Sequence, residues 1–273
     1  MTLPEIKNHW EQWASEFGTD LRATTKTPTI KQLEVDVVYR AIKSLFSKDA
    51  PLRLLDIGCG NGYNCFALTS FFPNYTYVGV DYSPTMIENA NKIKQEGGAK
   101  YDTISFAVGD VLNLQQNAEI GDNFDIAHSD RCIINLNTLE MQTKSFDEIM
   151  SKVKTGGYYL MLENSVQTHS RQNDLREAVN LPRRQVMEFN LFIDEPAFLA
   201  HTEKTAELVS IRDFGTLHDL VLYVLTPMIN GGEVDYNHQW VRTITDFLVS
   251  VPEEYSNQFG SFGQNRLWIF KKK

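Results

Sequence analysis

Few cysteines, no long apolar run and no apolar leader are present in this sequence, and each absence excludes a class of protein. The chain has three cysteines, an odd number without a C-x-x-C pair, which argues against both a disulfide framework and a zinc site. No segment approaches the roughly 18 consecutive apolar residues of a membrane span. The polar start at residues 1–13 lacks the apolar region of a secretory signal. We therefore expect a cytoplasmic protein with reduced thiols and no membrane segment.

Basic residues are also too few for an electrostatic binder of polyanions. The chain carries 26 Lys and Arg against 35 Asp and Glu, a formal net charge of -9, and its one basic cluster is the run at residues 271–273. A chain of this balance is unsuited to broad capture of nucleic acid or of anionic membranes. We expect a small-molecule partner instead. The sequence leaves open whether the chain is a monomer or a homodimer.

Glycines at alternate positions are the most informative feature that is present. The run at residues 54–62 reads as a buried strand, with the acid Asp56 near its end, that enters a Gly58-x-Gly60-x-Gly62 turn and then a helix. Glycine permits positive φ and a close approach of the backbone to a ligand. The spacing differs from the G-x-G-x-x-G of dinucleotide sites, and no G-K-[ST] of a P-loop follows. A nucleoside-type site without a phosphate is indicated.

Two further acids follow predicted strands. Asp81 closes the strand at residues 75–80, and Asp110 follows the apolar run at residues 104–108. A carboxylate at the end of the second strand can accept hydrogen bonds from both hydroxyls of a ribose. An NAD-dependent dehydrogenase is the nearest rival. The glycine spacing and the extra acid Asp56 argue against it.

Strands and helices alternate through the middle of the chain. Strands are predicted at residues 53–57, 75–80, 104–108, 124–128 and 157–163, and helices at about 63–71, 84–95 and 139–154. Alternation of this kind favours an α/β, doubly wound, mostly parallel sheet with both faces covered. Ligands then bind beyond the carboxyl ends of the strands. Asp56, Asp81, Asp110 and Glu163 all fall at such ends.

The flanking segments are predicted to cover this site. Residues 1–50 read as an N-terminal helical lid, 51–165 as the cofactor-binding core, and 166–273 as the rest of the same domain with acceptor-side helices. A last strand is expected at 264–271. The long segment before it, about 213–262, reads as an inserted helical cap, because long ordered insertions are usually functional. A packing or dimer surface is the alternative.

At the glycine turn and the acids, the chain resembles the class I S-adenosylmethionine-dependent methyltransferases. The matching blocks, in family order, are residues 55–62, 78–83, 109–111 and 124–129. The resemblance implies a Rossmann-like, seven-stranded sheet and S-adenosyl-L-methionine as cofactor. It places the glycine turn at the methionine part, Asp81 at the ribose, Asp110 at the adenine amine, and residues 128–131 at the methyl-transfer chamber. The cofactor-binding residues expected from it are Asp56, Gly58, Cys59, Gly60, Asn61, Gly62, Asp81, Tyr82, Met86, Asp110, Val111, Ser129 and Arg131.

Three residues are candidates for the base that removes a proton from the acceptor. His128 ends the fourth strand and titrates near neutral pH, although a histidine hydrogen-bonded beneath the cofactor would look the same. Asp130 follows on the same loop as base or orienter, or as a partner in a loop ion pair with Arg131. Glu163 ends the fifth strand and is the third catalytic candidate. Too few ligands accompany Asp130 to predict a metal.

The predicted function is methyl transfer from S-adenosylmethionine to an oxygen or nitrogen of a small molecule. The run at residues 129–136 also resembles bacterial methyltransferases of sugars and surface polysaccharides, which makes a sugar or sugar nucleotide one candidate acceptor. The [DNS]-P-P-[YF] run typical of nucleic-acid amino-methyltransferases is absent there. A cofactor-binding regulatory or scaffold protein without catalysis is the alternative from another class.

Overall fold

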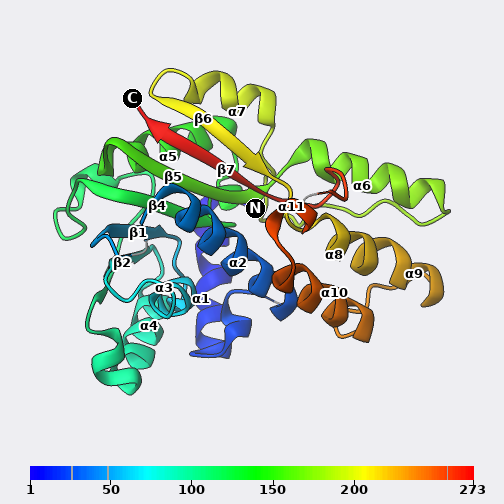
Figure 1. The fold of residues 1–273 in the computed structure, drawn as a ribbon, viewed down its shortest axis with the longest axis horizontal. Coiled ribbons are helices and arrows are strands. Elements are labelled where there is room, and N and C mark those ends of the chain that lie inside the picture. The colour runs from blue at the N-terminus through cyan, green and yellow to red at the C-terminus, as the bar shows by residue number, and fades with distance from the viewer. Residues whose placement is uncertain (26, 48, 257) are drawn as a thin grey trace.

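A seven-stranded sheet lies at the centre of the protein in a computed structural model, which describes residues 1–25, 27–47, 49–256 and 258–273 (Figure 1). The strands are β1 (Arg53–Ile57), β2 (Thr76–Asp81), β3 (Ile104–Val108), β4 (Phe124–Asp130), β5 (Val153–Asn164), β6 (Ala206–Arg212) and β7 (Asn265–Lys272). Their order is β3-β2-β1-β4-β5-β7-β6, and β7 alone runs antiparallel to both of its neighbours. The predicted α/β fold with a mostly parallel, Rossmann-like sheet is confirmed.

Helices precede, connect and follow the strands. The longer ones are α1 (Leu3–Phe17), α2 (Pro28–Leu45), α3 (Tyr63–Thr69), α4 (Pro84–Gly97), α5 (Leu139–Lys152), α6 (Val166–Ala178), α7 (Glu195–Thr202) and α10 (Gln239–Ser250). The shorter ones are α8 (Thr216–Leu220), the π-helix η5 (Val221–Leu225), α9 (Thr226–Ile229), α11 (Glu253–Ser256) and the 3-10 turns η1 (Leu21–Ala23), η2 (Gly98–Tyr101), η3 (Leu114–Gln116) and η4 (Ile133–Asn135). The start of α4 follows the sequence closely: the Ser83 hydroxyl accepts from the Met86 amide, and Pro84 takes the first helical position.

Each face of the sheet buries its own apolar core. On one face, α5 and α7 contribute Phe146, Ile149 and Phe198 against sheet residues that include Trp268 and Phe270. On the other face, α2, α3 and α10 pack over the strands, and α2 uses the predicted apolar stripe that begins with Ile30, Leu33 and Val37. Two covered faces leave only the ends of the strands open to a ligand.

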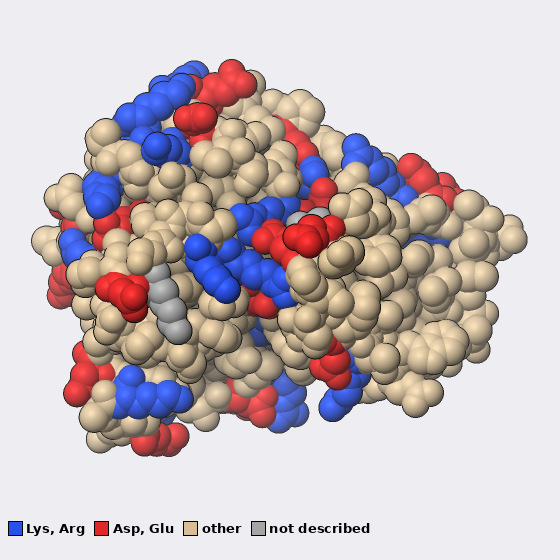
Figure 2. All heavy atoms as spheres, in the orientation of Figure 1, with Lys and Arg blue, Asp and Glu red and all other residues tan. Residues whose placement is uncertain are grey.

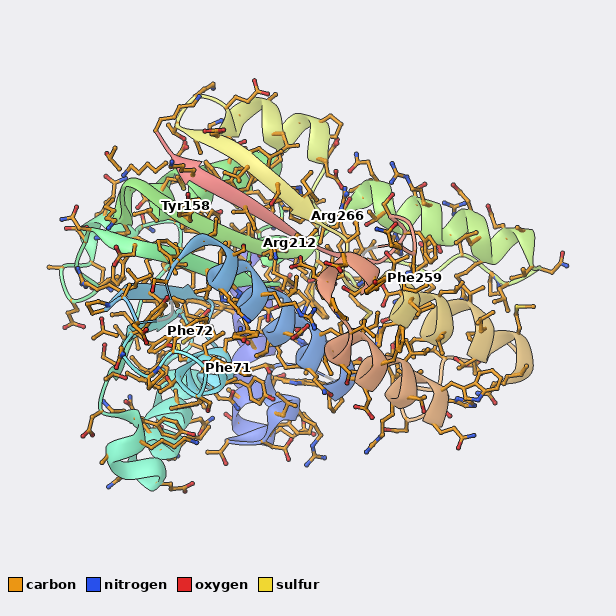
Figure 3. The ribbon with its side chains drawn as sticks, viewed as in Figure 1. Phe71, Phe72, Tyr158, Arg212, Phe259 and Arg266 are labelled. Carbon is orange, nitrogen blue, oxygen red and sulfur yellow. The ribbon has the colours of Figure 1, made fainter. Side chains whose placement is uncertain are left out.

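The segments predicted as lid and cap lie toward the same end of the sheet. Helix α1 packs on α4, and α10 packs on α2, while α8 to α11 lie between β6 and β7 in the sequence (Figure 1). Arg212 and Arg266, labelled in Figure 3, tie this region to the sheet: Arg212 donates to Glu253 of α11 (2.8 Å), and Arg266 pairs with Asp213 (2.8 Å). The roles of lid and cap as a cover over the site stay predictions. Residues 26, 48 and 257 fall inside these segments and lie outside the described residues.

Several element boundaries differ from the sequence prediction, and the start of β5 differs most. Helix α5 ends at Lys152 rather than continuing to residue 154, because Val153 is buried and pairs with Phe124 of β4, which starts β5 early. Helix α6 begins at Val166, since the Ser165 hydroxyl accepts from the amides of Gln167 and Thr168 and caps it.

On the face drawn in Figure 2, acidic and basic side chains are interspersed rather than gathered by sign.

Candidate functional site: one cavity between the glycine turn and the N-terminal helices

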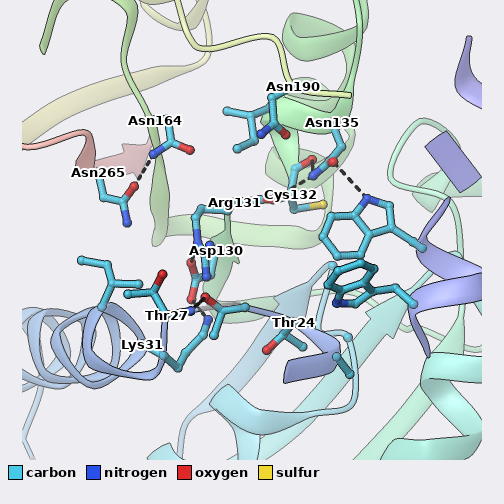
Figure 4. A pocket seen from close by; sticks show the side chains of 18 of the residues that line it. Thr24, Thr27, Lys31, Asp130, Arg131, Cys132, Asn135, Asn164, Asn190 and Asn265 are labelled. Atoms are coloured by element: carbon cyan, nitrogen blue, oxygen red, sulfur yellow. Dashed lines mark hydrogen bonds and ion pairs between the residues drawn. The ribbon is translucent and has the colours of Figure 1, made fainter. Parts of the chain in front are cut away.

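A cavity of about 390 Å³ opens at the carboxyl ends of the strands (Figure 4). Its walls come from three parts of the chain. The glycine turn and the ends of β2 and β4 form one side, and α1 and α2 form a second. The third side comes from the loop 187–190, from α8 and η5, from Tyr236 and from the start of β7. The predicted cofactor motifs and the predicted lid therefore line the same space.

The glycine turn has the backbone that its sequence predicts. Gly58, Gly60 and Gly62 have φ values of 67°, 54° and 84°, a region that disfavours side chains. A Cβ at Gly58 would lie 2.5 Å from the Cys132 Sγ, and one at Gly60 would lie 2.7 Å from the Thr24 Cγ2. The turn therefore needs glycine both for its conformation and for close approach, as a cradle for a ligand requires.

Asp81 links the turn to the second strand. Its Oδ2 accepts from the Gly60 amide and its Oδ1 from the Ser83 amide, both at 2.9 Å, and its side chain lines the cavity. Burial raises the pKa of Asp81 to about 6, although these two hydrogen bonds favour the charged form. A carboxylate held in this way keeps lone pairs for hydroxyl donors, which fits the ribose role that the sequence predicts.

Asp56 and His128 form a buried pair beneath the turn. They are register partners on β1 and β4, and the His128 Nδ1 lies 2.9 Å from the Asp56 Oδ1, with each side chain 1% exposed. Among the described residues, no partner reaches the His128 Nε2, and neither side chain lines the cavity. The structure therefore places His128 and Asp56 beneath the turn and outside the cavity lining, and the catalytic role of His128 and the cofactor role of Asp56 stay predictions.

Glu163 is likewise turned away from the cavity. Its carboxylate accepts from the amides of Cys132, Ile133 and Ile134 and from the Ser129 hydroxyl, at 2.9–3.3 Å. Full burial raises its pKa to about 8, against these four hydrogen bonds. Glu163, with the Ser129 hydroxyl bonded to it, thus holds the backbone of the loop after β4. The catalytic role predicted for Glu163 and the cofactor role predicted for Ser129 stay predictions.

Asp130 and Arg131 do face the cavity, within an ion network that sequence reasoning missed. Lys31 of α2 donates to the Asp130 Oδ2 (2.5 Å) and lies 3.1 Å from the Glu34 Oε2, while the Arg131 Nε lies 2.9 Å from the Glu34 Oε1 (Figure 4). Burial by itself would raise the pKa of Asp130, but Lys31 and then Arg131 hold it well below its usual range. Arg131 adopts a φ of 54°, a strained value for a residue with a side chain.

The remaining predicted cofactor residues divide into two groups. Cys59, Tyr82 and Met86 line the cavity together with the glycine turn. Asn61, Gly62, Asp110 and Val111 are not among the described lining residues. Asn61 instead donates to the Asp20 carbonyl (3.0 Å) and so holds the N-terminal segment, whereas Asp110 is exposed and its Oδ1 accepts from the Leu112 amide (2.9 Å). The adenine role of Asp110 with Val111 stays a prediction.

Side-chain amides dominate the far side of the cavity. Six of them line it: Asn64, Asn135, Asn164, Asn190, Gln264 and Asn265. Beside them, the Trp10 indole donates to the Asn135 Oδ1 (3.0 Å), and the His9 ring stacks on Phe189 at 4.7 Å between centroids. These residues come from segments far apart in the chain, and the sequence carries no local pattern that groups them.

The cavity fits a nucleoside cofactor that lacks phosphate. The turn needs glycine because a Cβ at Gly58 or Gly60 would clash with Cys132 or Thr24. The acid after β2 is buried at the edge of the cavity, and the turn itself presents no Lys or Arg to a phosphate. Fold and site together define an α/β protein with an adenosyl-cofactor site. The chain matches the family model described as a methyltransferase domain over residues 48–214, well over half of its length, so it belongs to this methyltransferase family.

Similar proteins carry related descriptions. Carboxy-S-adenosyl-L-methionine synthase of Campylobacter curvus is 35% identical over 82 residues, which is 29% of this chain and 34% of that protein. Malonyl-[acyl-carrier protein] O-methyltransferase of Legionella pneumophila is 29% identical over 123 residues, 45% of this chain and 41% of that protein. The solved structure of the mitomycin 7-O-methyltransferase MmcR superposes with a TM-score of 0.60 at 14% identity, covering all of this chain and 61% of that one.

The family match confirms the predicted class, an S-adenosylmethionine-dependent methyltransferase, and with it the predicted cofactor. The chain spans about a third to two fifths of the length of the first curated relatives that it matches. Within the described residues, no helix is long and apolar enough to cross a membrane.

Proposed function

We propose that this protein transfers a methyl group from S-adenosylmethionine to an oxygen or nitrogen of a small molecule. The observation that supports this most is the continuity of the cavity, which joins the glycine turn to the amide-lined chamber without a partition. Methyl donor and acceptor need one enclosed space, because attack requires the two reacting atoms at about 3–3.5 Å and in line.

The cofactor half would be held by the chain in three places. The glycine turn lies against the methionine part, Asp81 accepts from the ribose hydroxyls, and Asp110 with Val111 contacts the adenine. When bound, the cofactor supplies a methyl group on a cationic sulfur. The acids around the turn favour this positive charge, since an opposite charge nearby stabilises a cation.

Asp130 is the residue that we assign to the acceptor. Its Oδ2 accepts from Lys31 and from the Asn64 amide (3.2 Å), whereas its buried Oδ1 lies 3.5 Å from the Arg131 Nε and accepts no hydrogen bond from the described residues. An acceptor hydroxyl or amine that donates to Oδ1 has its lone pair oriented for attack. A carboxylate of low pKa remains a competent base here, because the attacking atom becomes positively charged and its proton strongly acidic during the reaction.

A sugar fits the acceptor half better than a wholly apolar molecule does. Amide side chains offer both donors and acceptors, which suits adjacent hydroxyl groups. Aromatic side chains such as Trp10 and Phe189 offer flat apolar surface to the carbon face of a ring. A sugar or sugar nucleotide is therefore the acceptor class that we propose.

Incubation with trideuteromethyl-labelled S-adenosylmethionine tests this proposal. The acceptor panel comprises methyl glycosides, amino-sugar glycosides and uridine-diphosphate sugars, and mass spectrometry follows both the labelled product and the demethylated cofactor. Label on a glycoside hydroxyl or amine supports the proposal, and Asp81→Ala serves as the control without cofactor binding.

One alternative function has a specific observation in its favour. Two of the three predicted catalytic side chains, His128 and Glu163, lie outside the cavity, as they would in a protein that binds the cofactor without chemistry. Cofactor binding by calorimetry, combined with no label on any panel member, would favour that regulatory or scaffold role. Failure to bind the cofactor at all would contradict both the methyltransferase function and the regulatory or scaffold role.

A further inference from the structure

Lys31 occupies an unusual position for a lysine. It lies in the first turns of α2, outside the segment matched by the family model, yet its side chain is 4% exposed and lines the cavity. Buried lysines are rare unless they are paired. The burial of Lys31 therefore requires the two carboxylates that surround it, Asp130 on the loop after β4 and Glu34 one turn further along α2.

The contacts of Lys31 fix the orientation of the Asp130 carboxylate. Lys31 and the Asn64 amide both donate to Oδ2, from α2 and α3 respectively. Two donors on one oxygen restrict rotation of the carboxylate, so the other oxygen, Oδ1, stays at a defined place. That oxygen is buried, lies 3.5 Å from the Arg131 Nε and accepts no hydrogen bond from the residues described.

Charged groups surround Asp130 from every element that packs against it. Lys31 and Glu34 face it from α2, Arg131 and His128 from its own strand and loop, and Glu163 from β5. Glu34 is shared between the two cations, and Asn265 also donates to it (2.8 Å). Lys31 is the cation that contacts Asp130 most closely, whereas the Arg131 Nε lies 3.5 Å from it.

We propose that Lys31 is a positioning residue for methyl transfer, which fixes the Asp130 carboxylate in the wall of the cavity where the acceptor binds. This inference rests on the proposed function, because it concerns the same acceptor site. It assigns part of the reaction centre to the N-terminal helical segment rather than to the family domain. Lys31 contacts Asp130 and not the reacting atoms, so its removal acts through the carboxylate.

Removal of the Lys31 charge should change how turnover depends on pH, which a loss of packing alone would not do. In Lys31→Met, Asp130 stays buried but loses its nearest cation, and burial without compensation raises a carboxyl pKa. The carboxylate then takes up a proton within the ordinary working range of pH. Turnover becomes pH-dependent and recovers as the pH rises, whereas a purely structural defect lowers turnover equally at every pH.

The test combines a spectroscopic titration with kinetics on the full chain. Protein labelled with ¹³C at the aspartate carboxyl carbons is titrated by NMR, and Asp130→Asn identifies the Asp130 signal. We expect no titration of Asp130 above about pH 4 in the wild type, and a midpoint above about pH 5 in Lys31→Met. Lys31→Arg retains the cation and is expected to keep the wild-type behaviour. An unchanged Asp130 titration in Lys31→Met would overturn the proposal.

Kinetics are measured with methyl β-D-glucopyranoside as probe, together with the affinity for S-adenosylhomocysteine. We expect kcat of Lys31→Met to fall about tenfold for each pH unit below the Asp130 midpoint found by NMR and to recover above that midpoint, with cofactor affinity unchanged. An equal loss at all pH values would contradict a positioning role. If Lys31→Met does not fold, the double variant Lys31→Met/Asp130→Asn is made, because it removes both charges. A double variant that folds but does not turn over supports the pairing of Lys31 with Asp130.

Failure of this inference and failure of the proposed function give different results. A wild-type protein that transfers no methyl group contradicts the proposed function. The NMR titration still decides whether Lys31 controls the ionisation of Asp130, because it needs no acceptor.

Discussion

The two halves of the cavity are built in different ways. The cofactor half takes most of its lining from one short part of the chain, residues 58–86, where the turn, Asp81 and Met86 follow one another within two strand–helix units. The acceptor half draws on residues from Trp10 to Asn265, spread over nearly the whole chain. The first half is a local structure, whereas the second exists only when the complete fold has formed.

This difference separates what is common to the family from what is particular to this chain. The family model ends at residue 214 and begins at 48, so it contains the whole glycine turn. Trp10 and Lys31 lie before it, and Tyr223, Tyr236 and Asn265 lie after it. We infer that the flanking segments determine which acceptor enters, while the shared domain determines which cofactor binds.

The substitution with the largest expected effect impairs the acceptor half of the cavity alone. Asp130→Asn should reduce kcat by a factor of about 10²–10⁴, because it removes the proton acceptor while keeping the shape of the side chain. Affinity for S-adenosylhomocysteine, measured by calorimetry, should change less than about threefold. Comparable losses of turnover and cofactor affinity would show that the two halves are not separable at this residue.

A second substitution breaks the cofactor half. Asp81→Ala should weaken binding of S-adenosylhomocysteine by about 100-fold or more, since hydrogen bonds to a charged group contribute about 1.5–3 kcal/mol each. In the wild type, affinity should also fall as the pH drops below about 6, because the protonated acid accepts hydrogen bonds poorly. Asp81→Asn is the matched control and should lose this pH dependence. Wild-type affinity in Asp81→Ala would contradict the ribose assignment.

Glu163 tests the loop that joins the two halves. Its pKa of about 8 in the fold lies above its usual value, so the folded state binds the proton more tightly than the unfolded state does. The contribution of Glu163 to stability should therefore fall as the pH rises from about 4.5 to about 8, by up to about 1.4 kcal/mol per pH unit. Urea unfolding of the wild type and Glu163→Gln over this range measures the difference in slope. Parallel pH profiles for the two proteins would contradict this account of Glu163.

The smallest expected effect sharpens the acceptor half. Asn190→Ala removes one amide from the chamber and should raise KM for the acceptor by about tenfold or less, the value of one net hydrogen bond. The KM for S-adenosylmethionine should not change. Asn91→Ala, a substitution on α4 away from the cavity, is the control. A larger change in KM for S-adenosylmethionine than in KM for the acceptor would place Asn190 in the cofactor half instead.

The place of the glycine turn and of Asp81 at the cavity could be predicted from the sequence because their signals are local. Ser83 and Pro84 mark the start of α4, and the glycine spacing defines the turn without knowledge of the rest of the fold. Asp81 could be assigned to the cavity edge because it ends a strand of a parallel sheet. Position at a strand end was a reliable guide wherever the side chain had no stronger partner nearby.

The same rule failed for side chains that the fold engages elsewhere. His128 pairs with Asp56 because β1 and β4 are neighbours in a register that the sequence does not reveal. Glu163 ends β5, but the amides of the next loop capture its carboxylate. Lys31 and Glu34 resemble an ordinary surface pair at i and i+3, and only the tertiary structure shows that they are buried beside Asp130.

A crystal structure of the protein with S-adenosylhomocysteine is the most direct test of the central claim, that one cavity holds donor and acceptor together. The account predicts the ribose on Asp81, the amino-acid part along the glycine turn, and the sulfur directed toward Asp130 and the amide-lined chamber. A cofactor whose sulfur faces away from Asp130, or one bound outside the space between the glycine turn and α2, would contradict it.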